Sequence, residues 1–206
     1  MINYQYGKFL ERLMILREGL PLIDVDFLNP VFESTEDNGM LIAGLITAIE
    51  TFSGTIDAGE INIIDRGNSK IIIEKRNSLM GVLIIKKDPE TKVDEYKIRL
   101  EKVIDLFIEK YNDMLNVLIG NAIDTNIFSE FIPYGIGLLM DPVSEKATPF
   151  PKQVSAFPGM SGETWKLVML IDGVSTVKQI IDRIGNDKII PLFAFLEASN
   201  VIGLRK

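Results

Sequence analysis

The chain has 206 residues, of which 47% are hydrophobic and 25% charged, and this much apolar surface excludes a chain that is disordered throughout. It contains no cysteine and no histidine, which excludes disulfides, thiolate or imidazole metal sites and histidine-dependent catalysis. The net charge of −7 is concentrated in residues 1–140, where 14 basic and 22 acidic side chains give −8. An acidic body disfavours nucleic acid or an anionic bilayer as the main partner.

The first predicted element is a β-hairpin. Leu13–Arg17 and Pro21–Phe27 are two short apolar runs separated by Glu18-Gly19. Because glycine readily adopts the positive φ of a tight turn, this spacing predicts two antiparallel strands.

A helix is predicted next, because apolar residues recur at spacings of three and four: Leu41, Leu45, Ala48, Ile49 and Phe52. Ser53-Gly54 is expected to end it. Gly39 and Gly44 lower the helix propensity, which favours close packing of this helix on a sheet.

Three strands follow, over Glu60–Asp65, Lys70–Lys75 and Leu79–Lys86. The connections between them are too short for crossovers, so the strands are predicted to form an antiparallel meander. The runs in the second and third strands are apolar on both faces, which indicates central strands covered on both sides.

The longest predicted helix runs from about Val93 to Leu118, where one apolar stripe faces a charged side. A short helix around Thr125–Ile132 is predicted to bury Phe128 and Phe131, with Pro133 ending it.

Residues 141–160 hold four of the nine prolines and are predicted to form a linker. The final segment, 161–206, is predicted to contain helices over Trp165–Ile171, Val177–Ile184 and about Asp187–Ser199, then a strand over Val201–Arg205. The predicted fold class is therefore α+β, with a five-stranded antiparallel sheet and flanking helices over residues 1–140 and a small helical domain over 161–206.

The order strand, strand, helix, three strands, helix, helix over residues 13–132 resembles the longin fold. The related roadblock fold has the same five-stranded sheet and central helix but carries its extra helix in front, and Tyr6–Glu11 could be a stub of that helix. The C-terminal segment resembles a winged-helix domain. That resemblance rests on Asp172-Gly173 after the first helix, on the capped helix from Ser175, and on the third helix leading into Val201-Ile202.

Longin and roadblock domains are non-enzymatic platforms that bind small Ras- or Arf-like GTPases, SNARE-type partners or one another in adaptor and trafficking complexes. Some GTPase-regulatory subunits place a winged-helix module after such a domain. The resemblance therefore implies an adaptor or regulatory subunit, without enzymatic activity, cofactor or metal. Its expected partner is a small GTPase or another longin or roadblock chain, in a homo- or heterodimer.

We expect a cytoplasmic protein that reaches membranes only through a partner. No run approaches the ~20 apolar residues of a membrane span. The N-terminal residues lack the basic and then apolar pattern of a secretory signal.

Partner-binding residues are expected on the Leu41–Phe52 helix, on the first strand and on the last helix, where packing is the alternative role. The candidates are Leu41, Leu45, Phe52, Ile15, Leu192, Phe193 and Phe195.

The main alternative is a transcription regulator, in which residues 1–140 dimerise or sense a ligand and the winged helix binds DNA. Its third helix has Lys188 as its one basic residue, a proline and the acidic Glu197. Residues 161–206 have six basic and five acidic side chains, a weak footprint for DNA. Lys188, Arg205 and Lys206 would be the DNA contacts.

Two further sites remain as hypotheses. Asp24 and Asp26 share one strand face, with Glu18 nearby, and could hold Mg²⁺ in an enzyme, although a solvated strand face is the simpler interpretation. The chain has no G-x-x-x-x-G-K-[ST] motif, so any GTP belongs to a partner. In roadblock-type GTPase activators an arginine can enter the partner's site, and Arg66 and Arg76 lie in predicted turns with the reach for this.

Overall fold

The computed structural model describes residues 9–28, 36–55, 62–152 and 162–205, except for 118–123. The described chain divides into two compact units between Ser129 and Glu130. We call residues 9–129 the N-terminal unit and residues 130–206 the C-terminal unit. The division lies before residue 140, where the sequence placed the end of the first domain.

The N-terminal unit is built on one five-stranded antiparallel sheet with the order β2-β1-β5-β4-β3. Its strands are β1 (Leu10–Arg17), β2 (Leu20–Asp26), β3 (Ile63–Arg66), β4 (Ser69–Arg76) and β5 (Leu79–Lys86). The predicted hairpin and meander are confirmed: β1 pairs with β2, and β3, β4 and β5 pair in sequence. Glu18 and Gly19 both have positive φ, as a two-residue hairpin turn requires.

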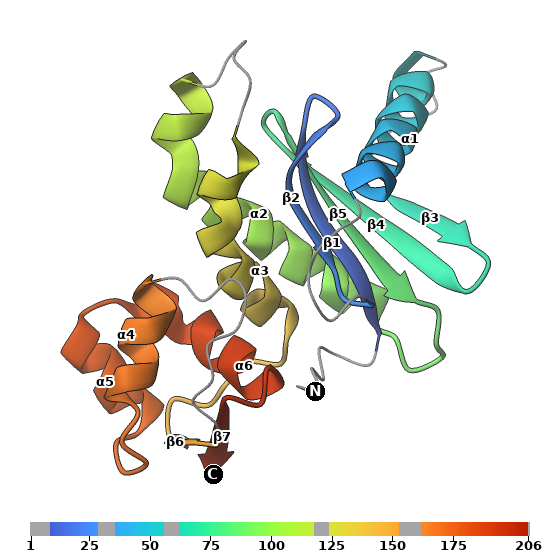
Figure 1. Ribbon diagram of the computed structural model, residues 1–206. Helices are drawn as coiled ribbons and strands as arrows, with labels where there is room; N and C mark the ends of the chain where they lie inside the picture. The colour runs from blue at the N-terminus through green and yellow to red at the C-terminus, as the bar shows by residue number, and fades with distance from the viewer. Residues whose placement is uncertain (1–8, 29–35, 56–61, 118–123, 153–161, 206) are drawn as a thin grey trace. The chain divides into compact units, whose positions relative to one another are not determined.

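Helix α1 (Glu36–Thr55) packs on one face of the sheet and α2 (Val93–Val117) on the other (Figure 1). On the first face, Ala43 and Ile46 of α1 join a core formed by side chains of β1, β4 and β5: Met14, Leu16, Ile71, Ile73 and Val82. A strand buried on both faces needs apolar residues at consecutive positions, which is why β4 and β5 carry such runs.

On the second face, α2 comes close to β5 at Gly81. A Cβ at this position would lie 2.5 Å from Cδ1 of Ile104, so any larger residue would force the Ile104 side chain to shift. Most of the stripe predicted for α2 is buried here, including Leu100, Val103 and Phe107, but Met114, which was predicted to belong to it, is 39% exposed. The 3₁₀ helix η1 (Thr125–Phe131) follows, and the ring of Phe128 lies 5.2 Å from that of Phe107.

The C-terminal unit contains α3 (Ile132–Leu139), β6 (Thr148–Pro151), α4 (Gly162–Leu170), α5 (Val177–Ile184), the 3₁₀ helix η2 (Asp187–Ile189), α6 (Ile190–Ala198) and β7 (Ile202–Arg205). The sequence did not predict α3. Pro133 was expected to end a helix, and this was wrong, because it occupies the first turn of α3. Backbone N–H groups in the first turn make no hydrogen bond within the helix, so a proline there costs none.

Helix α3 packs along α6 within the C-terminal unit. The two backbones meet at Gly137, where a Cβ would lie 1.9 Å from the carbonyl oxygen of Pro191. The hydroxyl of Tyr134 on α3 donates a 2.8 Å hydrogen bond to Glu163 on α4. Part of the predicted linker is also structured, because β6 pairs antiparallel with β7.

Candidate protein-docking surface and other predicted sites

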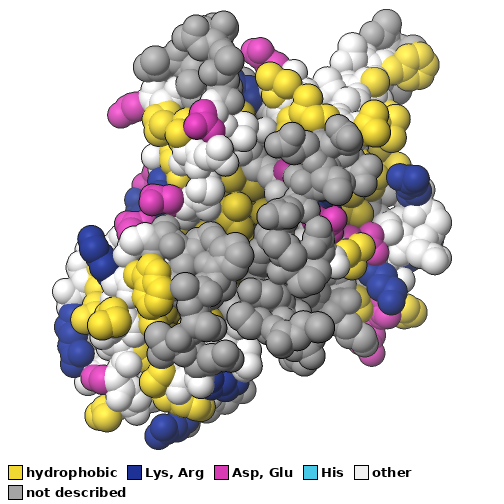
Figure 2. Space-filling view, in the orientation of Figure 1, with side chains coloured by type: hydrophobic (Ala, Val, Ile, Leu, Met, Phe, Trp, Pro, Cys, Tyr) yellow, Lys and Arg dark blue, Asp and Glu magenta, His cyan; other side chains and the backbone are white. Residues whose placement is uncertain are grey.

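The outward side of α1 is apolar. Leu41 is 71% exposed, Leu45 53% and Phe52 64%. Hydrophobic side chains are visible at the surface over α1 (Figure 2). Residues four, seven and eleven positions apart lie on one side of a helix, so the three form a single stripe with Ala48. We call Leu41, Leu45, Ala48 and Phe52 the α1 stripe.

Among residues 39–53 of α1, no exposed side chain beside the α1 stripe is charged; Glu36 and Asp37 precede this stretch in the first turn of the helix. Met40, Gly44 and Thr51 are exposed beside it, and Thr51 donates its hydroxyl hydrogen bond to the carbonyl of Thr47. Glu50, the charged residue in this stretch, is buried on the opposite side and pairs with Lys75 of β4. An exposed helix face without charge is typical of a surface that another macromolecule covers.

Close packing of α1 on the sheet explains why one of its residues, Gly39, is a glycine. A Cβ at Gly39 would lie 2.0 Å from Oδ2 of Asp24, which confirms the expected close packing there. At Gly44 the expectation was wrong, because this glycine is exposed and has no atom within 4 Å of where its Cβ would lie.

The other predicted partner residues lie in the cores of their units. Ile15 is fully buried in β1, and Leu192, Phe193 and Phe195 are buried in α6. In this conformation they are packing residues and are not presented to a partner. Among the predicted candidates, the α1 residues are the exposed ones.

The carboxylates of the predicted magnesium site have separate roles. Both oxygens of Asp24 accept hydrogen bonds from the Arg12 guanidinium at 2.7 Å, and both side chains are about nine-tenths buried. The hydrogen bond to Asp24 raises the pKa of Arg12 above its usual value, so the guanidinium stays charged. Asp26 accepts the backbone N–H of Leu28 at 2.9 Å in a turn after β2. Asp24 therefore serves as the counter-ion of a buried arginine.

The arginines of the N-terminal unit differ in how firmly they are held. Arg17 donates to the carbonyl of Leu115 at the end of α2, and Arg99 pairs with Glu95. Arg76 lies within 4 Å of three carboxylates, those of Glu74, Glu101 and Asp105. Arg66 is exposed and has no partner among the described residues. Of the two arginines predicted to reach a partner, Arg66 is the free one.

Helix α6, the predicted recognition helix, is covered on almost every side. Its residues from Leu192 to Leu196 are buried, and Glu197 is the one exposed residue of α6. A DNA-reading helix needs a row of exposed polar or basic side chains facing the major groove. This helix presents an acid in their place.

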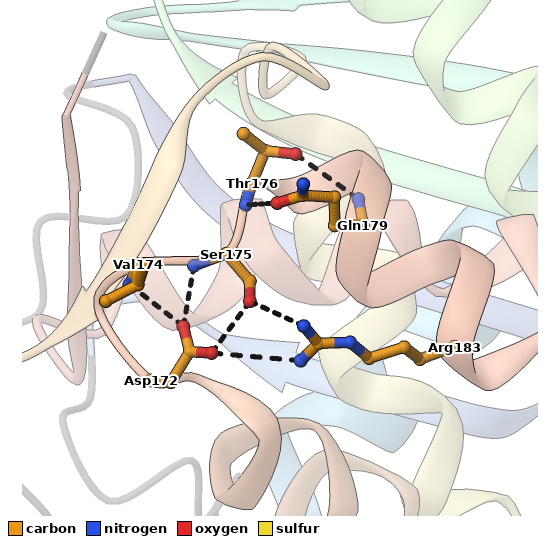
Figure 3. Close-up of polar contacts among 6 residues, drawn as sticks. All are labelled: Asp172, Val174, Ser175, Thr176, Gln179 and Arg183. Atoms are coloured by element: carbon orange, nitrogen blue, oxygen red, sulfur yellow. Dashed lines mark hydrogen bonds and ion pairs between the residues drawn. The ribbon is translucent and has the colours of Figure 1, made fainter.

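Helix α5 begins at a polar cluster around Asp172 (Figure 3). Asp172 Oδ1 accepts the backbone N–H groups of Val174 and Ser175 at 2.9 and 2.7 Å, and Oδ2 accepts the Ser175 hydroxyl at 2.7 Å. Arg183 donates to Oγ of Ser175 at 2.9 Å. Thr176 and Gln179 then form a capping box at the first turn of α5. The Asp-Gly-x-Ser-Thr sequence thus shapes the turn and caps the helix.

Acid is expected to weaken this cluster. The hydrogen bonds from Ser175 and Val174 hold the pKa of Asp172 well below its usual 3.8. A depressed folded-state pKa adds stability above pH 3.8 that is lost as the pH falls towards the folded value. Asp172→Asn should therefore lower the urea concentration at which the C-terminal unit is half unfolded at pH 7. Acidification should then lower this midpoint by less in the variant than in the native chain.

The measurement is urea unfolding followed by the fluorescence of Trp165, the single tryptophan, at neutral pH and below pH 3.8. Asp182→Asn, an exposed change on α5, is the matched control and should leave both midpoints unchanged. Equal effects of the two variants would contradict the role of Asp172.

Sequence reasoning missed Met40 and Gly44 as exposed neighbours of the α1 stripe. Their exposure depends on which side of α1 meets the sheet, and hydrophobic periodicity alone does not determine this for a helix that is apolar on both sides.

No protein-family model matches the chain. No curated protein is significantly similar to it. Within the described residues, no helix combines the length and the hydropathy needed to cross a bilayer.

Proposed function

We propose that this chain is a non-catalytic adaptor or regulatory subunit that binds a protein partner through the outward side of α1. The observation that carries this proposal is the α1 stripe, whose large side chains are half exposed or more and have no exposed charged neighbour among residues 39–53 of the helix. Covering such a surface releases water from apolar area, which is the main favourable term in protein association.

The partner we propose is a small Ras- or Arf-like GTPase, or another longin or roadblock chain. Support comes from the strand order β2-β1-β5-β4-β3 with one helix on each sheet face, which is compatible with a longin-like fold. Through such a partner the protein would act in trafficking or signalling, in the cytoplasm or at the surface of a membrane.

The test compares two charge substitutions at sites of equal exposure. Leu45 on α1 and Ile98 on α2 are each 53% exposed, so Leu45→Asp and Ile98→Asp add the same charge without opening a core. Both variants should unfold within about 0.5 kcal/mol of the native chain. In pull-downs with GTP or GDP after nuclease treatment, Leu45→Asp should reduce recovery of the partner at least about tenfold, as loss of an apolar anchor does. Ile98→Asp should not reduce it.

Mass spectrometry of the recovered proteins identifies the partner. A small GTPase or a longin or roadblock chain that depends on Leu45 would support the proposal, and a nucleotide preference would separate an effector from a regulator. Equal recovery with both variants would contradict docking on α1.

The transcription-regulator alternative gains no support from α6. Its exposed acid, Glu197, would face the negatively charged groove of DNA, and its apolar residues are occupied in the core. Partners that disappear on nuclease treatment would favour that alternative over the adaptor.

A further inference from the structure

Gly44 is a glycine of α1 that packing within the chain does not explain. It lies in the interior of a 20-residue helix, where glycine is the least favourable residue after proline. The carboxylate of Asp24 leaves no room for a Cβ at Gly39, but no atom lies within 4 Å of where a Cβ at Gly44 would be. The loss of helix propensity at Gly44 is therefore not offset by a close contact in the structure.

Gly44 is in the low middle of a row of residues on the exposed side of α1. The members of this row are four positions apart and follow one another along the helix surface: Met40, Gly44, Ala48 and Phe52. Met40 is 49% exposed and Phe52 64%, so large side chains stand at both ends of the row. Leu41, three positions before Gly44, stands beside it. The short side chains between them leave a notch whose floor is the helix backbone.

The notch is uncharged. No exposed side chain among residues 39–53 carries a charge, and Glu50 is buried on the opposite side with Lys75. The hydroxyl of Thr51, beside the notch, donates to the carbonyl of Thr47 within the helix. A charged side chain of a partner would lose its hydration here without gaining a counter-ion. The surface that fits the notch is therefore apolar.

We propose that an apolar helix of the partner crosses α1 at Gly44 and places one large side chain in the notch. This inference rests on the proposed docking at the α1 stripe and specifies what docks there. Rows of residues four positions apart are the surfaces on which helices pack ridge into groove, and a small residue at the crossing lets the backbones approach closely. Contact with a second helix accounts for a glycine that the fold of the chain does not require.

The test uses two substitutions that fill the notch without weakening the helix. Gly44→Ala should raise the urea midpoint of the N-terminal unit, measured by circular dichroism, because alanine is the better helix former. The probe is the protein whose recovery in pull-downs depends on Leu45. Its recovery should fall about fivefold with Gly44→Ala and at least about tenfold with Gly44→Leu, as overpacking of a close contact does.

Gly162→Leu is the matched control, because Gly162 is also exposed and has no atom within 4 Å of its would-be Cβ. It should leave the recovery unchanged. Unchanged recovery of a Leu45-dependent protein with Gly44→Leu would overturn the notch contact and leave the proposed docking on α1 intact. Recovery of no Leu45-dependent protein would contradict both.

Cross-linking tests whether the docked element is a helix. The chain has no cysteine, so Met40→Cys and Thr51→Cys each provide a unique thiol for a short photo-cross-linker near one end of the notch. The partner residues attached by the two thiols should lie in one segment at spacings of three, four or seven, which place them on one side of a helix. Attachment at alternate residues or in separate segments would overturn the proposed helix.

Discussion

Replacing Gly137 by alanine is expected to unfold the C-terminal unit under conditions in which the native chain is folded. The new Cβ would lie 1.9 Å from the carbonyl oxygen of Pro191 and 2.6 Å from its carbonyl carbon. Both are backbone atoms at the first turn of α6, so no side chain can rotate away to relieve the overlap. Helices α3 and α6 would have to separate, and the core around Leu192 and Phe193 would open. We expect a loss of about 3 kcal/mol, the upper end for overpacking.

Urea unfolding followed by Trp165 fluorescence measures this loss, because Trp165 is on α4 within the same unit. Gly162→Ala is the matched control: Gly162 is exposed and has no atom within 4 Å of its would-be Cβ. That variant should unfold within about 0.5 kcal/mol of the native chain. Equal midpoints for the two variants would contradict the close contact between α3 and α6.

Replacing Asp24 by asparagine is expected to destabilise the N-terminal unit by about 3 kcal/mol, because it leaves the buried charge of Arg12 without its counter-ion. Asparagine has nearly the same shape, so the effect reports the lost charge and not a cavity. The Arg12 guanidinium would be left nine-tenths buried beneath Gly39 of α1, where water cannot replace the carboxylate.

Asp26→Asn is the control two residues away. Asp26 accepts the backbone N–H of Leu28, which an amide oxygen can also accept, and its charge acts on Arg12 only at longer range than that of Asp24. This variant should therefore cost less than about 1 kcal/mol. Circular dichroism measures unfolding of the sheet, while Trp165 should report an unchanged C-terminal unit. Equal losses in both variants, together with stabilisation of the native chain by Mg²⁺, would contradict the ion pair and restore the metal hypothesis.

Local chemistry made most elements of this fold predictable. Antiparallel pairing is the simple arrangement for strands joined by short links. The glycine turn between β1 and β2 and the short connections among β3, β4 and β5 predicted it, and the structure has it. The charged and apolar sides of α2 are distinct, so its buried side was predicted correctly. Helix α5 carries its own start and stop signals in Thr176 and Gly185, and its bounds were predicted to the residue.

The candidate docking surface was predicted only in part. Leu41, Leu45 and Phe52 are exposed, but Ile15, Leu192, Phe193 and Phe195 are buried. Helix α6 is buried partly by α3. Helix α3 was not predicted, because Pro133 at its start was interpreted as the end of a helix.

By itself, the sequence determined the α+β class, the order of the elements up to η1 and the absence of cysteine and histidine chemistry, because these depend on composition, periodicity and turn residues. Only the tertiary structure decided which side of α1 meets the sheet. Gly39, Ala43 and Ile46 face inward and let the helix approach closely, while the larger Leu41, Leu45 and Phe52 face outward. A helix with two apolar sides can bury either side. Packing against the sheet selects the side that fits, and the local sequence pattern carries no information about that fit.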